Sequence, residues 1–386
     1  MKNENIILFS SDDWGWKTSK YQLAIRFCRQ NKVLFVSSIG FRRPTASRQD
    51  MGRIFGKLKL FFKGVTRVQE NLYVLTPLAI PLHNYRFISW LNGILIRTQV
   101  RWARMRLSIQ NPYVFVFSQN WYDIMKNLPR KKLVYYLVDE HSSFKGVDLE
   151  SFQNLNRQIC QHADIVFCSS KSLALKQKEL NPNTFHISHG VNYDLFSRAV
   201  FDPDLHSAPE LADISRPTLG FWGHISYEWV DVSLLKYLAE KRPEWTFLLI
   251  GRDSMELDEF EHHKNIRLVG EKNFEDLPSY CKAIDVALIP FVKSALTDNC
   301  NPLKLYEYLA AGLPVVSTDI PEVRFWKDSV LIAKERGTFL ESCETAMKLN
   351  GKEWKEKTSL SMKSNTWDQK VKDIYQIIRE EPTFHE

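Results

Sequence analysis

Short apolar runs alternate with amphipathic segments along most of the chain. The first such group is an apolar run at 6–11, an amphipathic segment at 18–30 and a second apolar run at 33–38. Further runs follow at 72–76, 113–118, 133–138, 165–168, 186–188, 218–223, 246–250, 266–269 and 286–290. This alternation is typical of parallel strands joined by crossover helices. It predicts an α/β protein with doubly wound sheets, whose ligands bind beyond the carboxyl ends of the strands.

The alternation breaks once, which indicates two domains. Residues 196–217 show no periodicity and contain three prolines, as expected of a linker. A chain of 386 residues is also long enough for two separate cores. We predict an N-terminal domain over 1–198, a linker over 199–214 and a C-terminal domain over 215–366.

The segment 297–322 has the strongest functional pattern. Asn301 and Pro302 suit the start of a helix, and Gly312 suits its left-handed end. Lys304 falls in the first turn, where a cation opposes the helix dipole, and a phosphate bound at the helix start would explain it. Glu307, one turn further on, could accept hydrogen bonds from a ribose diol. The alternative is an ordinary connecting helix with an exposed Lys and Glu.

Four segments of the C-terminal half, PTLGFWGHIS, EWTFLLIGR, NIRLVGEKNFEDLPSYCKAIDVALIPF and PLKLYEYLAAGLPVV, resemble the glycosyl transferases group 1 in order and spacing. The resemblance implies a GT-B fold: two Rossmann-like domains facing a cleft, with the C-terminal helix (367–386) crossing back to the N-terminal domain. The N-terminal domain would bind the acceptor and the C-terminal domain the nucleotide-sugar. Glu307 would bind the donor ribose, while Leu303 and Lys304 would lie on its phosphates.

The same resemblance points to further donor-binding residues. Gly223 would let the backbone approach the ligand. His224 stands in a loop where many relatives carry Arg or Lys, so Lys304 and Arg252 are the available cations; Arg252 is equally explained as a surface residue. Phe274 would stack on the base or lie in the core. Many retaining relatives carry a second Glu where this chain has Asn299, which leaves the donor sugar and the stereochemical outcome open.

An inverting transfer needs a general base, and the sequence offers three candidates. Asp139 is the first, because it directly follows an apolar run that would fix it; a helix cap is the alternative role. Asp13 is the second candidate and His141 the third. A retaining enzyme would need no protein base.

Charge is distributed unevenly along the chain. Residues 1–110 contain 19 Lys and Arg against 5 Asp and Glu, which predicts a polyanionic partner for this half. Within 51–65, basic and aromatic residues mix as in segments that lie in an anionic membrane interface. The residues are Arg53, Phe55, Lys57, Lys59, Phe61, Phe62 and Lys63. Residues 86–109 add arginines and tryptophans. A solvated basic face is the alternative, and no RNA-binding motif is visible.

Together these patterns predict a cytoplasmic glycosyltransferase, peripheral on the inner face of the cell membrane. It would move a sugar from a nucleotide diphosphate-sugar to a lipid-linked or oligosaccharide acceptor in cell-surface polysaccharide biosynthesis, without metal or other cofactor and without nucleic acid. No apolar run reaches the ~18 residues of a membrane span, no signal-peptide pattern is present, and the six cysteines show no metal spacing. A nucleotide-sugar epimerase and a non-catalytic binding protein are the alternatives.

Overall fold

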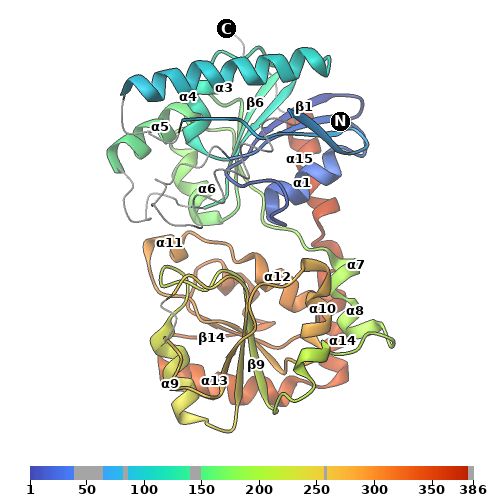
Figure 1. Cartoon of the computed structure of the whole chain (residues 1–386). Helices are drawn as coiled ribbons and strands as arrows, with labels where there is room; N and C mark the ends of the chain where they lie inside the picture. Colours follow the sequence, from blue (N-terminus) through green and yellow to red (C-terminus); the bar gives the residue numbers. More distant parts are fainter. Residues whose placement is uncertain (39–63, 81–85, 140–148, 256–258, 381–386) are drawn as a thin grey trace. The chain divides into compact units, whose positions relative to one another are not determined.

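The computed structural model describes residues 1–38, 64–80, 86–139, 149–255 and 259–380. It divides into two compact units, each with its own sheet (Figure 1). The first comprises Met1–Val138, Gly146–Ile187 and Val371–Glu386, and the second Asp139–Lys145 and Ser188–Lys370. Among the described residues, no helix is long and apolar enough to cross a membrane.

The first unit is built on an eight-stranded sheet in the order β3-β4-β2-β1-β5-β6-β7-β8. Its strands are β1 (Asn5–Phe9), β2 (Lys32–Val36), β3 (Val65–Gln69), β4 (Leu72–Leu75), β5 (Tyr113–Val116), β6 (Lys132–Leu137), β7 (Ile165–Cys168) and β8 (Thr184–His186). Only the edge pair β3–β4 is antiparallel among these pairings. The other pairings are parallel, as the apolar runs predicted. Most residues of these runs are buried, which is typical of parallel strands covered on both faces.

Helices cover this sheet, including one that returns from the end of the chain. They are α1 (Ser19–Phe27), α3 (Arg86–Arg106), α4 (Tyr122–Met125), α5 (Leu149–His162), α6 (Lys171–Lys178) and the last turns of α15 (Trp367–Glu380). In α15, the Tyr375 ring stacks on Phe27 at 5.4 Å, and its hydroxyl accepts a 2.9 Å hydrogen bond from Asn31 Nδ2. The predicted crossing of the C-terminal helix to the N-terminal domain is confirmed.

The second unit has a six-stranded parallel sheet in the order β11-β10-β9-β12-β13-β14. Its strands are β9 (Thr218–Trp222), β10 (Thr246–Ile250), β11 (Ile266–Leu268), β12 (Val286–Ile289), β13 (Val315–Thr318) and β14 (Val330–Ala333). Its helices are α7 (Tyr193–Phe196), α8 (Arg198–Phe201), α9 (Val232–Lys241), α10 (Leu277–Cys281), α11 (Ala295–Asp298), α12 (Leu303–Ala310), α13 (Arg336–Leu349) and α14 (Lys352–Ser361).

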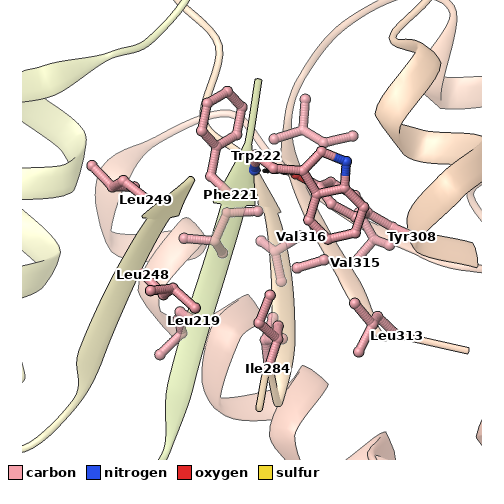
Figure 2. Close-up of a cluster of buried hydrophobic side chains, with 14 of the residues drawn as sticks. Leu219, Phe221, Trp222, Leu248, Leu249, Ile284, Tyr308, Leu313, Val315 and Val316 are labelled. Carbon is pink, nitrogen blue, oxygen red and sulfur yellow. Dashed lines mark hydrogen bonds between the residues drawn. The ribbon is translucent and has the colours of Figure 1, made fainter. Parts of the chain in front are cut away.

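The core of the second unit fixes the end of β9 against α12 (Figure 2). At Gly220 a Cβ atom would lie 2.3 Å from Ile284 Cδ1, so only glycine allows the tight packing beside this strand. Two positions later, the backbone N–H of Trp222 donates to the Tyr308 hydroxyl at 3.1 Å, and the two rings meet edge to face at 4.1 Å. The strand end and the helix are therefore held as one rigid pair.

The units divide the chain earlier than the predicted boundaries. Residues 188–198 were assigned to the N-terminal domain and 199–214 to a linker, yet both stretches belong to the second unit. Phe196, Ala208 and Leu211 are buried in its core. These apolar residues are spaced irregularly, so their burial leaves no periodic pattern in the sequence.

Candidate functional site

The neighbouring strands β9 and β10 are each followed directly by a glycine with positive φ. Gly223 has φ 142° and Gly251 has φ 139°, in the region that favours glycine. The N–H of Gly223 donates to the Ile250 carbonyl at 2.9 Å, so the two strand ends run side by side. A Cβ atom at Gly251 would lie 1.9 Å from the Gly223 carbonyl oxygen. The carboxyl edge of the sheet is therefore bare backbone here, as at ligand sites of such sheets.

Lys304, in the first turn of α12, lies directly over this bare backbone. A Cβ atom at Gly223 would be 2.6 Å from Lys304 Nζ. The ammonium lies 5.3 Å from the ring centroid of Phe221 and 5.4 Å from that of Phe291, a cation–π arrangement. Burial lowers the pKa of Lys304. The site thus holds a desolvated positive charge that an anionic group would stabilise.

The predicted helix is present, but its start differs from the prediction. α12 begins at Leu303 with Pro302 as its cap residue, and Asn301 does not cap it. The Asn301 side chain is buried and donates through Nδ2 to the Tyr306 hydroxyl at 3.0 Å, so it is not available to the helix start. The predicted end is confirmed: Gly312 has φ 70°, and its N–H and that of Leu313 bond to the carbonyls of Leu309 and Tyr308, each at 3.0 Å.

Glu307 lies in the same helix and is almost fully buried. Its Oε2 accepts a 2.8 Å hydrogen bond from Trp222 Nε1, at the end of β9. Burial raises the pKa of Glu307 to about 7, although the Trp222 hydrogen bond and the positive charge of Lys304 act in the opposite direction. A buried carboxylate of this kind is stabilised by any ligand that brings hydroxyl donors to it.

The raised pKa of Glu307 predicts how the stability of the folded protein depends on pH. The folded protein holds a proton on Glu307 up to about pH 7, whereas the ordinary value is 4.5, so the folded state loses stability as pH rises through this window. Glu307→Gln should therefore be more stable than the wild type at pH 8, by up to about 3 kcal/mol. The difference should shrink toward pH 5. Urea titrations at several pH values, without nucleotide, measure it; a gap that stays constant with pH would contradict the assignment.

His224 and Arg252 follow the two glycines and extend the site. His224 Nε2 lies 2.8 Å from Ser254 Oγ, and a short parallel bridge joins Ile225 to Asp253. Burial first, and then the positive charges of Arg252 and Lys304, lower the pKa of His224. The structure thus places His224 beside the two cations Arg252 and Lys304 at this edge of the sheet, and these surroundings disfavour a charge on the imidazole.

Two other predicted donor residues have structural contacts of their own. Phe274 is half-buried and meets Phe196 edge to face at 5.5 Å, while Phe196 stacks on Trp222 at 6.1 Å. It therefore packs at the edge of the core, as in the alternative interpretation, with part of its surface exposed. Asn299 is buried just after α11 and donates through Nδ2 to the Ala295 carbonyl at 2.7 Å. Its amide nitrogen thus supports the helix end.

Two of the three candidate bases lie in described loops that follow strands of the first unit. Asp139 comes two residues after β6 and is half-buried; it is grouped with the second unit. Asp13 is half-buried in the loop after β1. His141 lies outside the described residues, as do the predicted membrane residues Arg53, Phe55, Lys57, Lys59, Phe61, Phe62 and Lys63.

Asp12 belongs to the same polar loop as the candidate base Asp13, but the sequence assigned it no role of its own. Its Oδ2 accepts a 2.6 Å hydrogen bond from the Thr18 hydroxyl and lies 3.3 Å from Lys20 Nζ, at the start of α1. Burial alone would raise the pKa of Asp12, but Lys20 and the Thr18 hydroxyl more than offset this and lower it. Asp12 thus ties the loop after β1 to α1. The only sequence signal was the Thr and Lys at the helix start.

Similarity to known proteins agrees with this geometry. Residues 216–348, which include the strand-end glycines, Lys304 and Glu307, match the family described as Glycosyl transferases group 1. The putative teichuronic acid biosynthesis glycosyltransferase TuaH of Bacillus subtilis (strain 168) is 30% identical over 224 residues, which cover 55% of this chain and 55% of that protein. The chain is thus matched over about half the length of this curated relative.

Solved structures match nearly the whole chain. Anabaena Alr3699/HepE in complex with UDP-glucose has a TM-score of 0.68 at 13% identity, covering 97% of this chain and 99% of that one. Sucrose-phosphate synthase from Thermosynechococcus elongatus has a TM-score of 0.69 at 14% identity, covering 98% and 99%. At these identities the likeness shows the fold. The predicted resemblance is confirmed: the chain has the GT-B fold, and residues 216–348 match the glycosyl transferases group 1 model.

Proposed function

We propose that this protein is a glycosyltransferase that takes its sugar from a nucleotide diphosphate-sugar bound at the β9–β10–α12 site. The observation that carries the proposal is Lys304, held by two aromatic rings over the bare backbone of Gly223. A cation placed there at the start of a helix fits a diphosphate, because the helix dipole and the ammonium both favour negative charge. The complexes of Alr3699/HepE with UDP and with UDP-glucose support a donor of this class.

In this proposal each part of the site has a role. Glu307 binds the ribose hydroxyls, and Lys304, with the backbone at Leu303, binds the diphosphate. Arg252 adds a positive charge and His224 a polar group, while the exposed part of Phe274 contacts the nucleobase and Asn299 contacts the donor sugar. These cations and the helix start stabilise the departing diphosphate, so the transfer proceeds without a metal ion. Among the described residues, no cluster of three or more His, Cys, Asp or Glu side chains is placed to hold one.

The first unit takes the acceptor in this proposal. A lipid-linked saccharide is the proposed acceptor and a cell-surface polysaccharide the product, which the similarity to TuaH supports. Asp139 is the proposed base, with Asp13 and His141 as the other candidates. The excess of Lys and Arg within residues 1–110 supports work at the inner face of the cell membrane, in contact with its anionic lipids.

The donor site is tested by Glu307→Ala and Lys304→Ala. Each should weaken the binding of a nucleoside diphosphate by on the order of ten- to a hundred-fold, because each removes a charge-assisted contact. Isothermal titration calorimetry with a panel of nucleoside diphosphates measures these affinities and also identifies the nucleobase that the site prefers. Glu341→Ala and Lys348→Ala, which remove the same residue types from the exposed face of α13, are the matched controls. Unchanged affinity in both site variants would remove the basis of the proposal.

The reaction class is tested with nucleotide sugars in the presence and absence of membrane extract. Transfer that requires the extract supports a glycosyltransferase with a lipid-linked acceptor. Epimerisation of the sugar without any acceptor would instead show an epimerase of the same fold. Binding without turnover of any donor would indicate a non-catalytic protein.

A further inference from the structure

Helix α3 is attached to the first unit by one face only. Ile96, Val100 and Ala103 are buried in the core of this unit. On the same side, the Asn92 amide bonds to both the N–H and the carbonyl of Ile80, at 2.7 and 2.9 Å. The Gln99 amide bonds in the same way to Leu78, at 2.8 and 3.0 Å. These paired contacts fix the rotation of the helix about its axis, so its opposite face is constantly presented outward.

That outward face is largely apolar and aromatic, and the polar residues Thr98 and Arg101 are also exposed on it. Its large apolar residues follow one another at three, four, eight and three positions along the chain, and these spacings place them on one side of the helix. They are Phe87, Trp90, Ile94, Trp102 and Met105, which we call the α3 stripe, and their exposed fractions are 69%, 58%, 38%, 44% and 73%. Phe87 and Trp90 stack on each other at 5.8 Å. Large side chains exposed together to this extent mark an interaction surface.

The charged residues of helix α3 itself all have one sign. The 21-residue helix contains five arginines and no acidic residue. Arg101 and Arg106 are exposed, and the Arg106 guanidinium lies 5.6 Å from the Trp102 ring. Burial and the neighbouring charge of Arg101 lower the pKa of Arg104. An anionic partner would relieve this like-charge crowding.

We propose that the α3 stripe lies flat in the interface of an anionic lipid bilayer, with its arginines at the headgroups. The proposal rests on the proposed function, since it assigns the surface by which the enzyme reaches a lipid-linked acceptor. A helix of this length extends about 30 Å along a surface. Interfacial helices combine such a row of aromatic side chains with basic flanks, and tryptophan favours the headgroup level. A second protein chain is the other possible partner of this face. A helix whose charged residues are all arginines fits an anionic bilayer better.

The proposal is tested by sedimentation of the full chain with vesicles. We expect binding to phosphatidylcholine vesicles that contain phosphatidylglycerol, weak binding to pure phosphatidylcholine, and loss of binding at high salt. Phe87→Ser with Trp90→Ser should weaken binding at least tenfold even at low salt, because it removes the apolar contact. Arg101→Gln with Arg106→Gln should weaken it by on the order of tenfold and reduce the salt dependence.

Helix α6 of the same unit provides matched controls. Leu175 is exposed by 72%, and Lys176 and Lys178 are exposed on the same helix. Leu175→Ser, and Lys176→Gln with Lys178→Gln, should leave vesicle binding unchanged. Equal effects of the α3 and α6 variants would overturn the proposal, as would binding that ignores lipid charge.

The remaining outcomes distinguish binding to a bilayer from binding to a protein partner. They also test the membrane surface separately from the proposed enzymatic activity. Wild-type dimers that become monomers in the Phe87→Ser, Trp90→Ser variant, without vesicle binding, would show that a second copy covers the stripe and would overturn the proposal. Nucleoside diphosphate binding needs no membrane. A protein that binds nucleotide but not vesicles therefore refutes the α3 surface alone, and one that binds vesicles but turns over no sugar refutes the transferase.

Discussion

Asp139→Asn should reduce sugar transfer by about 100- to 10,000-fold while leaving the affinity for the nucleotide donor unchanged. A general base acts only while the acceptor hydroxyl attacks, and its removal costs about this factor. Asp139 closely follows β6, so the buried strand limits how far its backbone can move. The rate of transfer to an acceptor is measured by monitoring the release of the nucleoside diphosphate. Calorimetry measures the affinity for the donor.

The comparison needs a carboxylate variant that should stay active, and a variant of the second candidate base. Asp123→Asn removes an exposed carboxylate from α4 of the first unit and should retain full activity. An inactive Asp13→Asn variant beside an active Asp139→Asn variant would transfer the role of base to Asp13. Near-normal activity of both variants would favour a retaining reaction, in which the leaving phosphate takes the proton. Asp12 is unsuited as a control, because its replacement would loosen the start of α1.

The strands could be predicted from the sequence because each is a short apolar run between polar segments. The runs at 165–168 and 246–250 coincide with β7 and β10. Gly312 was predictable for a similar reason, since few other residues adopt its backbone conformation. These are local signals, readable from a few neighbouring residues.

What the sequence could not show depends on contacts between distant residues. Asn301 has the chemistry of a helix cap, but it is bonded to Tyr306 instead. Glu307 was predicted to bind a ligand, yet its burial beside Trp222, 85 positions away, sets its pKa and appears in no local pattern. Asp12 and Asp13 are adjacent and chemically identical, and only the fold distinguishes the one bonded to Thr18. Which of several possible partners such a side chain contacts depends on how distant segments of the chain pack together.

Gly251 offers a test of how tightly the carboxyl edge of the second sheet is built. Gly251→Ala should lower the free energy of unfolding by about 2–5 kcal/mol, because the new methyl group meets the Gly223 carbonyl oxygen and the backbone has positive φ. The melting temperature should fall by on the order of 10 °C. Nucleotide affinity should fall as well, since Gly223, over which Lys304 lies, must move to make room.

Two other glycines separate the causes of this loss. Gly270 has φ 72° but open space around its Cβ position, so Gly270→Ala should show only the cost of the backbone conformation, about 1–2 kcal/mol. Gly337 lies in α13 with open space and ordinary φ, so Gly337→Ala should leave stability unchanged or raise it slightly. Thermal denaturation of the three variants should therefore rank Gly251→Ala as the least stable by a wide margin. If Gly251→Ala melts together with Gly270→Ala, the two strand ends are free to separate, and the bare backbone beneath Lys304 is not a rigid platform for a diphosphate.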